Sequence, residues 1–592
     1  MTREERDKRE AEKKARLEGS PDIGGVTLPF SRASLLKAFW GFALFFPAWT
    51  LWNSRTDLSF ETVFAGSVLY VVCLFPSWMW TMGRVQGLPI FPIFALNFLP
   101  TYVTPLWEGH DQLKGYSFEQ VNTAAWTVAG FLIIAQLFWQ QSAVRAVGVP
   151  QTVRMIDLKK AEAVLIWCLL AEVLFELFFL LFWQLGGAGF AAVRGFASAA
   201  GRMGLFVFSY RLGQGELSPF KRAVFIGLVT LLVIQECASL LLSAALPTIG
   251  IVFAGYVLGS GKMPWKALSL TVVAISILHA GKFEMRAIYL DPEKPKTASL
   301  ADYPTYFAEW VGYGLKNLAA GGVSKETDEK VSSAAQRASL IHLMVQIQTM
   351  TPSQVPYLEG ATYTFIPSLL IPRVLSPEKA WAHTGNMILS LQYGILSGEA
   401  VWKTSVGFDP VMEAYANFGF LGVLVLAVIF GFFVGWTTRL TIHVPMLSFG
   451  FLFGVQVIAC LIGGWNTAGV LVTTVWQAFL ALLGLSLVLM SKQNNPVWKY
   501  YAIKLAEKLK FKKDPKLEKT LGEVKEILKA EDQSKDKGYG ISDIGREEGK
   551  AESGPTSLQT SPTREELRRV EEETGSVMHE RPTRFVYGKK GK

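Results

Sequence analysis

Apolar runs long enough to cross a membrane alternate with short polar segments through most of the chain. An apolar helix needs roughly 17–25 residues to cross a ~30 Å hydrocarbon core, and about twelve such runs are present. They predict an all-α polytopic membrane protein. The sixth run is interrupted by Arg202, and the seventh and eighth could be one bent segment and a short helix that separate at Pro247. The predicted spans are 36–53, 62–82, 88–107, 120–140, 161–184, 196–212, 223–242, 243–260, 266–281, 412–436, 446–464 and 469–490.

The positive charges predict the orientation of these spans. Lys and Arg concentrate in loops on the cytoplasmic face of a membrane protein. Here they occur in 141–160, 211–222 and 262–266, which share one face if the N-terminus is cytoplasmic. An even number of spans then leaves the C-terminus inside and segment 282–411 outside. A long connection of this kind is usually functional, so we expect a small folded lid with one or two helices dipping toward the membrane.

This interpretation divides the chain into six parts. The tail combines a basic amphipathic helix on the inner leaflet with a charged segment poor in large apolar residues, for which we expect disorder. The parts are 1–30, a cytoplasmic polar segment; 31–281, spans one to nine; 282–411, the extracytoplasmic loop; 412–491, spans ten to twelve; 492–513, the amphipathic interfacial helix; and 514–592, the disordered cytoplasmic tail.

Composition narrows the class of protein further. Of the 592 residues, 50% are apolar and 18% charged, and the charges gather at the two ends, whereas a soluble domain is ~25% charged throughout. This excludes a soluble enzyme and a nucleic-acid-binding domain, and the net charge of +9 fits a cytoplasmic excess of Lys and Arg. The four cysteines lie in apolar runs without CxxC spacing, and nucleotide and HExxH fingerprints are missing, so we expect no cofactor and no metal.

Cationic side chains in the outer loop are candidates for binding a lipid phosphate. Arg grips phosphate oxygens through two N–H groups at once, and Lys supplies a point charge. Anchoring or snorkelling at the headgroups is the alternative role for these residues. The candidates are Arg286, Arg337, Arg373 and Lys379.

Three residues are candidate general bases: Glu359, Glu413 and His342. Glu359 follows two prolines on a stiff loop, where a structural turn is the alternative. His342 lies in an apolar helical run, where a buried structural histidine is more common than a base. Glu413 and Asn417 are four residues apart and share one helix face at the mouth of span ten. We expect that face to line a wet cleft near a loop arginine, with helix capping by Glu413 as the alternative.

Aromatic and intramembrane polar residues complete the candidates. Tyr357, Tyr363 and Trp381 could stack on sugar rings. Glu172, Glu176 and Glu236 lie inside spans and could relay protons, as a transporter needs, or bond between helices. The spacings Gly431-x3-Gly435 and Gly450-x3-Gly454 indicate close helix packing.

The outer loop and the span after it carry the run TPSQVPYLEGATY, then IPRVLSPEK, TSVG and EAYANFGFLG. This run resembles the Wzy-type O-antigen and exopolysaccharide polymerases, which join oligosaccharide repeat units. The resemblance implies a GT-C-like glycosyltransferase of the bacterial inner membrane that transfers glycan from undecaprenyl diphosphate without a nucleotide sugar or a metal. It implies membrane lipid and a chain-length regulator as partners. Family arginines are thought to hold the lipid diphosphate, and Arg286, Arg337 and Arg373 occupy such places. The long polar tail and the missing His-based motif depart from the family pattern.

The sequence leaves two other functions open. A lipid-linked glycan ligase shares the layout and uses a different acceptor. A transporter or flippase for lipid-linked saccharides would show internal repeats and broken helices near the midplane. No clear repeat relates the halves of the chain, and the polar candidates gather in the outer loop.

Overall fold

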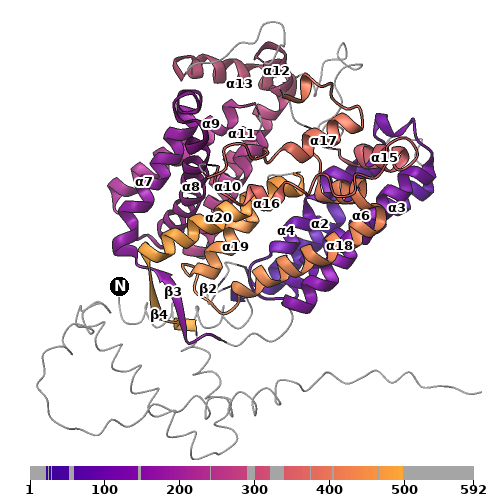
Figure 1. Cartoon of the computed structure of the whole chain (residues 1–592). Coiled ribbons are helices and arrows are strands. Elements are labelled where there is room, and N and C mark those ends of the chain that lie inside the picture. Colours follow the sequence, from indigo (N-terminus) through magenta and orange to yellow (C-terminus); the bar gives the residue numbers. More distant parts are fainter. Residues whose placement is uncertain are drawn as a thin grey trace, which may run out of the picture. The chain divides into compact units, whose positions relative to one another are not determined.

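A computed structural model describes residues 22–23, 26–27, 30–52, 59–143, 149–240, 242–289, 300–319, 339–373, 375–402, 406–462 and 466–497. Over these residues the protein is a helical bundle, and its strands are short (Figure 1). The predicted disordered tail 514–592 and residues 498–513 of the predicted amphipathic helix lie outside the described residues, as does nearly all of the predicted polar segment 1–30.

The first half of the chain forms two groups of helices. The first contains α2 (Arg32–Trp52), α3 (Phe60–Thr81), α4 (Ile90–Leu96), a π-helical turn η1 (Leu99–Val103), α5 (Thr104–Glu108), a 3-10 turn η2 (Asp111–Leu113) and α6 (Phe118–Ala143). The second contains α7 (Leu158–Leu177), α8 (Phe179–Gln214), α9 (Pro219–Ala238), a 3-10 turn η3 (Leu242–Ala244), α10 (Ala245–Ser260) and α11 (Trp265–Ala280).

The second half adds the outer helices and three long ones. The outer helices are α12 (Lys282–Tyr289), a 3-10 turn η4 (Leu300–Asp302), α13 (Tyr303–Ala319), α15 (Ile341–Met350), α16 (Ile366–Leu369), α17 (Thr384–Gln392) and a 3-10 turn η6 (Ala400–Trp402). The long ones are α18 (Pro410–Leu440), α19 (Phe449–Ile462) and α20 (Ala468–Leu489). The strands are β1 (Asp22–Ile23), β2 (Val26–Thr27), β3 (Thr152–Ile156) and β4 (Met490–Asn494).

A helix lies at each predicted span, and the all-α class is confirmed. Within the described residues, six helical segments are long and apolar enough to cross a membrane, or seven if α11 and α12, bent by 50°, form one span. The sequence predicted a break between the fifth and sixth spans, at residues 185–195. This prediction is wrong, because α8 is continuous through these residues. Residues 185–195 contain no proline that would stop a helix. The seventh and eighth runs separate at residues 239–244, ahead of Pro247.

Small residues let the helices approach closely. A Cβ atom on Gly431 would lie 2.3 Å from the carbonyl oxygen of Ala135, and one on Gly435 would lie 2.6 Å from Cβ of Ser142. These two glycines therefore bring α18 directly against α6, as their spacing predicted. Gly259 does the same for α10 against α8, where its Cβ would meet the carbonyl of Tyr210 at 2.0 Å.

A two-stranded sheet closes the bundle at the end of α20. Thr152 to Ile156 in β3 pair antiparallel with Asn494 to Met490 in β4. The predicted amphipathic helix therefore does not begin at residue 492, because the chain leaves α20 as a strand whose backbone groups bond to β3. Asn495 fixes the next turn by donating to the carbonyl oxygens of Pro150 and His443.

The described residues of segment 282–411 form short helices that pack on the rest of the bundle. Helices α12 and α13 lie together at one end of the bundle and pack against α11 (Figure 1). Trp310 is buried there and donates its indole N–H to the carbonyl of Leu278 at 2.6 Å. Helices α15 and α17 instead pack against α18, and α16 and α17 pack against α20. The loop thus has two parts, and the second part covers the region described next.

Candidate functional site

The first turns of α18 are fully buried and end at a break. Asp409 caps the helix by accepting from the N–H of Met412 at 2.8 Å, and Pro410 occupies the first helical position. Phe418 and Gly419 have non-helical backbone angles, with φ of −141° and +61°. The residues from Val411 to Asn417 therefore form a short helix of their own, followed by the long apolar one. A broken helix at membrane depth needs other groups to bond its freed carbonyls.

The loop at residues 358–363 supplies those groups. The N–H groups of Leu358 and Glu359 donate to the carbonyls of Ala416 and Asn417 at 3.0 and 3.2 Å. The Asn417 side chain accepts from the N–H of Gly360 at 2.9 Å and donates to the Thr362 hydroxyl at 2.8 Å. Two motifs that are 55 residues apart in the sequence are thus joined through the amide of Asn417.

Gly360 is required for this junction. Its φ of +89° is a conformation that residues with a Cβ rarely adopt, and a Cβ there would lie 3.1 Å from the ring of Phe418. Tyr363 stacks on that same ring, with centroids 6.3 Å apart. Burial, with the nearby charge of Glu413, raises the pKa of Tyr363 well above its ordinary value, so its hydroxyl stays protonated.

Glu413 binds the beginning of another helix. One carboxylate oxygen, Oε2, accepts from the N–H of Ala468, the first residue of α20, at 2.5 Å. The other, Oε1, faces Gly385, where a Cβ would lie 3.2 Å from it, and the Thr362 hydroxyl lies beside the same carboxylate. A carboxylate at a helix N-terminus is stabilised by the unbonded N–H groups and the helix dipole.

The wet cleft expected beside Glu413 is therefore not found, because Glu413 and Asn417 are both 0% exposed. Within the described residues, no ion pair joins Glu413 to an arginine, and the N-terminus of α20 takes the place of the arginine as the positive partner. Arg337 lies outside the described residues. The capping that was the alternative role does occur, with the difference that Glu413 caps α20 and Asp409 caps α18.

A second buried carboxylate lies one helical turn before Glu413. Asp409 is 0% exposed and accepts a short hydrogen bond from the hydroxyl of Tyr102 in the π-helical turn η1. Burial raises the pKa of Asp409 to about 6, although the hydrogen bonds it accepts oppose this. Single π-turns often mark functional sites, and this one aims Tyr102 at the head of α18.

A cationic pocket lies between α20 and the segment that follows α16. It has a volume of about 310 Å³, and Arg373, Lys379 and Trp381 line it. The opposite wall is largely apolar and comes from α8 and α20. The residues of that wall are Phe196, Thr473, Trp476, Gln477, Leu480 and Ala481.

The two cations of this pocket are held by backbone carbonyls. The Arg373 guanidinium donates to the carbonyls of Pro377 and Ala380 at 3.0 Å and lies 4.4 Å from the centroid of the Trp381 ring, a cation–π contact. Lys379 donates to the carbonyls of Leu369 and Ile371 at 3.0 and 2.5 Å. Burial and then the charge of Arg373 lower the pKa of Lys379.

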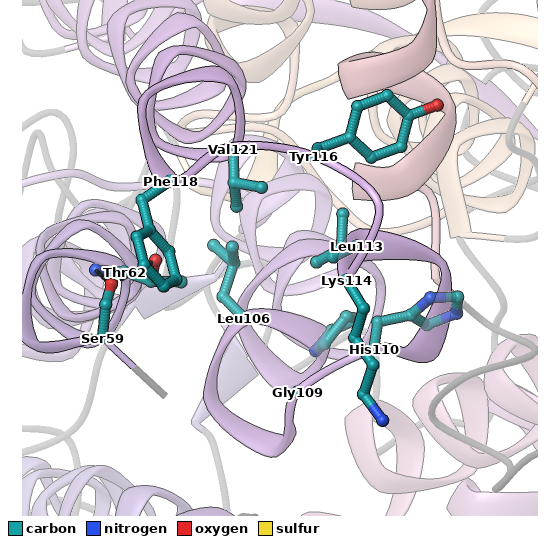
Figure 2. Close-up of a pocket in the computed structure, with 11 residues that line it drawn as sticks. Ser59, Thr62, Leu106, Gly109, His110, Leu113, Lys114, Tyr116, Phe118 and Val121 are labelled. Atoms are coloured by element: carbon teal, nitrogen blue, oxygen red, sulfur yellow. Dashed lines mark hydrogen bonds between the residues drawn. The ribbon is translucent and has the colours of Figure 1, made fainter. Parts of the chain in front are cut away.

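A second pocket, of about 240 Å³, lies between the first turns of α3 and α6 and the turn 109–114. Figure 2 shows Ser59, Thr62 and Phe118 on one side of it and His110, Leu113 and Lys114 on the other. The His110 ring is buried and stacks on the ring of His342 from α15, with centroids 4.9 Å apart and planes within 2°.

His342 is thus placed beside this second pocket by its contact with His110. Its Nδ1 pairs with the Ser339 hydroxyl at 3.2 Å. Burial, together with the neighbouring His110, lowers the pKa of His342 to about 4. The ring is therefore neutral at ordinary pH.

The other predicted residues divide between the two parts of the outer loop. Arg286 lies on α12, which packs with α11 and α13, and it does not line the Arg373 pocket. Glu359 is exposed with φ of +46°, so its side chain leaves the loop while its N–H binds α18. Tyr357 is 37% exposed, and its hydroxyl would meet a Cβ on Gly419 at 2.9 Å.

Three features of the site were missed from the sequence. Asp409 before Pro410 and an apolar run is an N-cap signal, which indicates its position but not its partner. Tyr102 and His110 carry no local signal, because their partners lie 307 and 232 residues further along the chain. The N-terminus of α20 as a partner for Glu413 was likewise outside the reach of local patterns.

The fold and these sites define a polytopic α-helical membrane protein with a covered, cationic pocket beside its late spans. The family model of O-antigen polysaccharide polymerase Wzy matches residues 337–494. That range includes α15 to α20, Arg373, Lys379 and Glu413, and it confirms the resemblance to the Wzy-type polymerases. No curated relative and no solved structure matches the chain.

Proposed function

We propose that the protein polymerises lipid-linked oligosaccharide repeat units at the outer face of a bacterial inner membrane. It transfers a growing glycan from undecaprenyl diphosphate to the non-reducing end of a second lipid-linked unit. The observation that carries the proposal is the pocket of Arg373, Lys379 and Trp381, which joins paired cations to an apolar wall inside the segment matched by the polymerase family model.

The pocket chemistry suits a lipid diphosphate. The two carbonyl bonds of Arg373 use two of its five N–H donors, and those of Lys379 use two of three. The remaining donors can bind phosphate oxygens. The pKa of Lys379 is lowered by burial and then by the charge of Arg373, and the negative charge of a diphosphate would oppose both effects. The apolar side chains of α20, Trp476 and Leu480 among them, offer a surface for the first isoprene units.

The reaction forms one C–O bond and breaks another. The acceptor hydroxyl oxygen attacks the anomeric carbon of the donor sugar and loses its proton to a base. The bond from that carbon to the diphosphate breaks, and the diphosphate leaves with the electron pair, stabilised by Arg373 and Lys379. The leaving group is already activated on the lipid, so the step uses no nucleotide sugar.

We assign the base to Glu413, with Asn417 holding the loop over it. The Glu413 carboxylate accepts from Ala468 and lies beside the Thr362 hydroxyl, which leaves lone pairs that can accept a proton from a substrate. α20 connects the two parts of the site, since its first N–H binds Glu413 and its next turns line the cationic pocket. Because Glu413 is buried, we expect segments 358–363 and 369–382 to open when the substrate binds. Tyr357, Tyr363 and Trp381 are then available to stack on sugars.

Deletion of the gene in its host, followed by gel analysis of surface glycan, tests the function. Loss of the polymer, with glycan that carries a single repeat unit, is the expected result. Lipid-linked polymer that accumulates in the envelope would instead show a ligase. Unchanged glycan would contradict both assignments and favour a transporter of another saccharide.

A further inference from the structure

The proposed reaction needs two saccharides, and the Arg373 pocket accounts for one lipid diphosphate. We infer that the second pocket, between α3, α6 and the turn 109–114, binds a saccharide ring of the acceptor. This inference rests on the proposed function and assigns the site of the second substrate.

The walls of the pocket suit a sugar. Tyr116 and Phe118 supply aromatic faces, which pack against the C–H groups of a pyranose, and Phe118 is 59% exposed and open to a ligand. Ser59 and Thr62 at the N-terminus of α3 and Lys114 on the opposite side supply hydroxyl and ammonium groups (Figure 2). An apolar site with a few convergent polar groups is the usual form of a small-ligand pocket.

Exposed aromatic residues beside the pocket indicate where it lies relative to the membrane surface. Phe60, Phe64 and Trp126 form a chain of ring contacts on the outer surface of α3 and α6, with centroids 6.4 and 6.2 Å apart. Of these rings, Trp126 is of the type that gathers where lipid headgroups meet water, and the two exposed phenylalanines continue the apolar surface beside it. The pocket therefore opens at the level of the headgroups, where the first sugars of a lipid-linked glycan lie.

A continuous set of contacts links the two pockets through Glu413. His110 at the second pocket stacks on His342 of α15, and α15 packs against α18. Glu413 of α18 binds the first residue of α20, whose next turns line the cationic pocket. Helices α15, α18 and α20 thus connect the elements that carry the two pockets, and the proposed base lies at the contact of α18 with α20.

Lys114 at the rim of the pocket forms an exposed ion pair with Asp111 at 3.1 Å. Exposed pairs of this kind stabilise a protein little, so the Lys114 ammonium can turn to a sugar hydroxyl at little cost.

Hydrogen exchange on the full-length protein in lipid nanodiscs tests the inference. The first probe is the saccharide released by mild acid from the host's own polymer, and the second is undecaprenyl diphosphate without sugar. We expect the saccharide to protect segments 59–62 and 109–121, and undecaprenyl diphosphate to protect 369–382 alone. Protection of 59–62 and 109–121 by undecaprenyl diphosphate would make the pocket a lipid-phosphate site and overturn the inference.

Two variants give a matched comparison. Phe118→Ala removes an exposed pocket wall, and Glu119→Ala changes the adjacent exposed residue, which does not line the pocket. Saccharide binding should weaken at least tenfold in the first and stay within twofold in the second. If the wild-type protein makes polymer in cells and the saccharide leaves 59–62 and 109–121 unprotected, the pocket assignment fails alone. If deletion leaves the polymer unchanged, the proposed function fails with it.

Discussion

At the scale of single residues, the head of α18 holds polar groups that are buried and individually bonded. Asp409, Glu413 and Asn417 each bind a different element: η1, α20 and the 358–363 loop. Buried polar groups cost free energy unless they are bonded, so these three contacts fix how the elements meet. The Glu413 carboxylate bonds to Ala468 beside the Thr362 hydroxyl and, with about four lone-pair positions, keeps the capacity to accept a further proton donor.

The Glu413→Gln variant removes the charge of this side chain and keeps its shape. The amide oxygen still accepts from the N–H of Ala468, so stability should fall by only about 0.3–1 kcal/mol, the usual value of a charge at a helix N-terminus. Polymerisation should fall by about 10²–10⁴-fold, the usual contribution of a general base. Turnover of lipid-linked units and thermal unfolding measure the two effects. Glu378→Gln, an exposed carboxylate in the same loop, is the control, and equal activity in the two variants would remove Glu413 from catalysis.

Arg373→Ala should abolish polymer while the protein stays in the membrane. Loss of one group that stabilises developing negative charge lowers the rate by about 10²–10³-fold. Arg373→Lys should restore little, because a point charge cannot bind two oxygens and one aromatic face together. Arg84→Ala is the matched control, because the Arg84 guanidinium also lies over an indole ring, with its Cζ 4.7 Å from the centroid of Trp78. Glycan length on gels reports the result, and wild-type length in Arg373→Ala contradicts the assignment.

His342 predicts how stability depends on pH. Its pKa is about 4 in the folded protein against an ordinary value of 6.5, so the unfolded chain binds more protons between these values. The contribution of His342 to the free energy of unfolding is therefore complete above pH 6.5. It is lost as the pH falls toward 4, and the loss is at most roughly 3 kcal/mol. Denaturant unfolding at several pH values measures this, and His342→Gln should show a flatter profile. An identical profile in the variant would assign the pH effect to other groups.

At the scale of elements, the break in α18 is the point at which the 358–363 loop binds the helix bundle. The carbonyls of Ala416 and Asn417 bond to N–H groups of the 358–363 loop. The loop therefore completes the broken helix, and the broken helix orders the loop. This mutual dependence explains why a segment of two prolines and a glycine is folded against the membrane part of the protein.

Gly360→Ala should loosen this junction. The side chain is strained at φ of +89° and meets the Phe418 ring at 3.1 Å, so we expect a loss of about 1–2 kcal/mol and weaker polymerisation. Gly398→Ala is the control, because no atom lies within 4 Å of a Cβ there. The two variants can be compared by thermal unfolding in detergent. A loss of the same size in both would show that the Gly360 junction is not rigid.

At the scale of the whole molecule, two groups of helices share the late spans. α18 packs along α6 in the first group, and α20 packs along α8 in the second. The head of α18 and the start of α20 meet at Glu413, so the proposed site lies where the two groups join. Ligand sites are common at such junctions, because relative movement of the groups can open and close them.

The orientation of the molecule is predicted by its basic loops. Reporter fusions at residues 330 and 550 should show 330 outside and 550 in the cytoplasm, because Lys and Arg gather in 141–160, 211–222 and 262–266. A reporter that is active only outside the membrane should work at 330. Activity of that reporter at 550 would reverse the proposed orientation and move the site to the wrong leaflet.

The sequence by itself determined where most of the helices lie, and it singled out the segment in which we propose the chemistry. Apolar runs locate helices because backbone groups in a membrane must bond within their own segment, which makes the signal local. The two glycine pairs, of which Gly431 and Gly435 pack on α6, and the folded outer loop were predicted for similar local reasons. Arg373, Lys379 and Trp381 were chosen individually and lie in one pocket, because only 8 residues separate the first from the last.

The tertiary structure alone decided what those residues touch. Glu413 was expected beside an arginine and instead binds the N–H of Ala468 at the N-terminus of α20, 55 residues away in sequence, because helix packing brings the two together. His342 was grouped with Glu413 and instead stacks on His110, and Arg286 packs with the other part of the loop. Partners that are distant in sequence are fixed by helix packing and by the need to bond each buried polar group, and neither is visible in a local pattern.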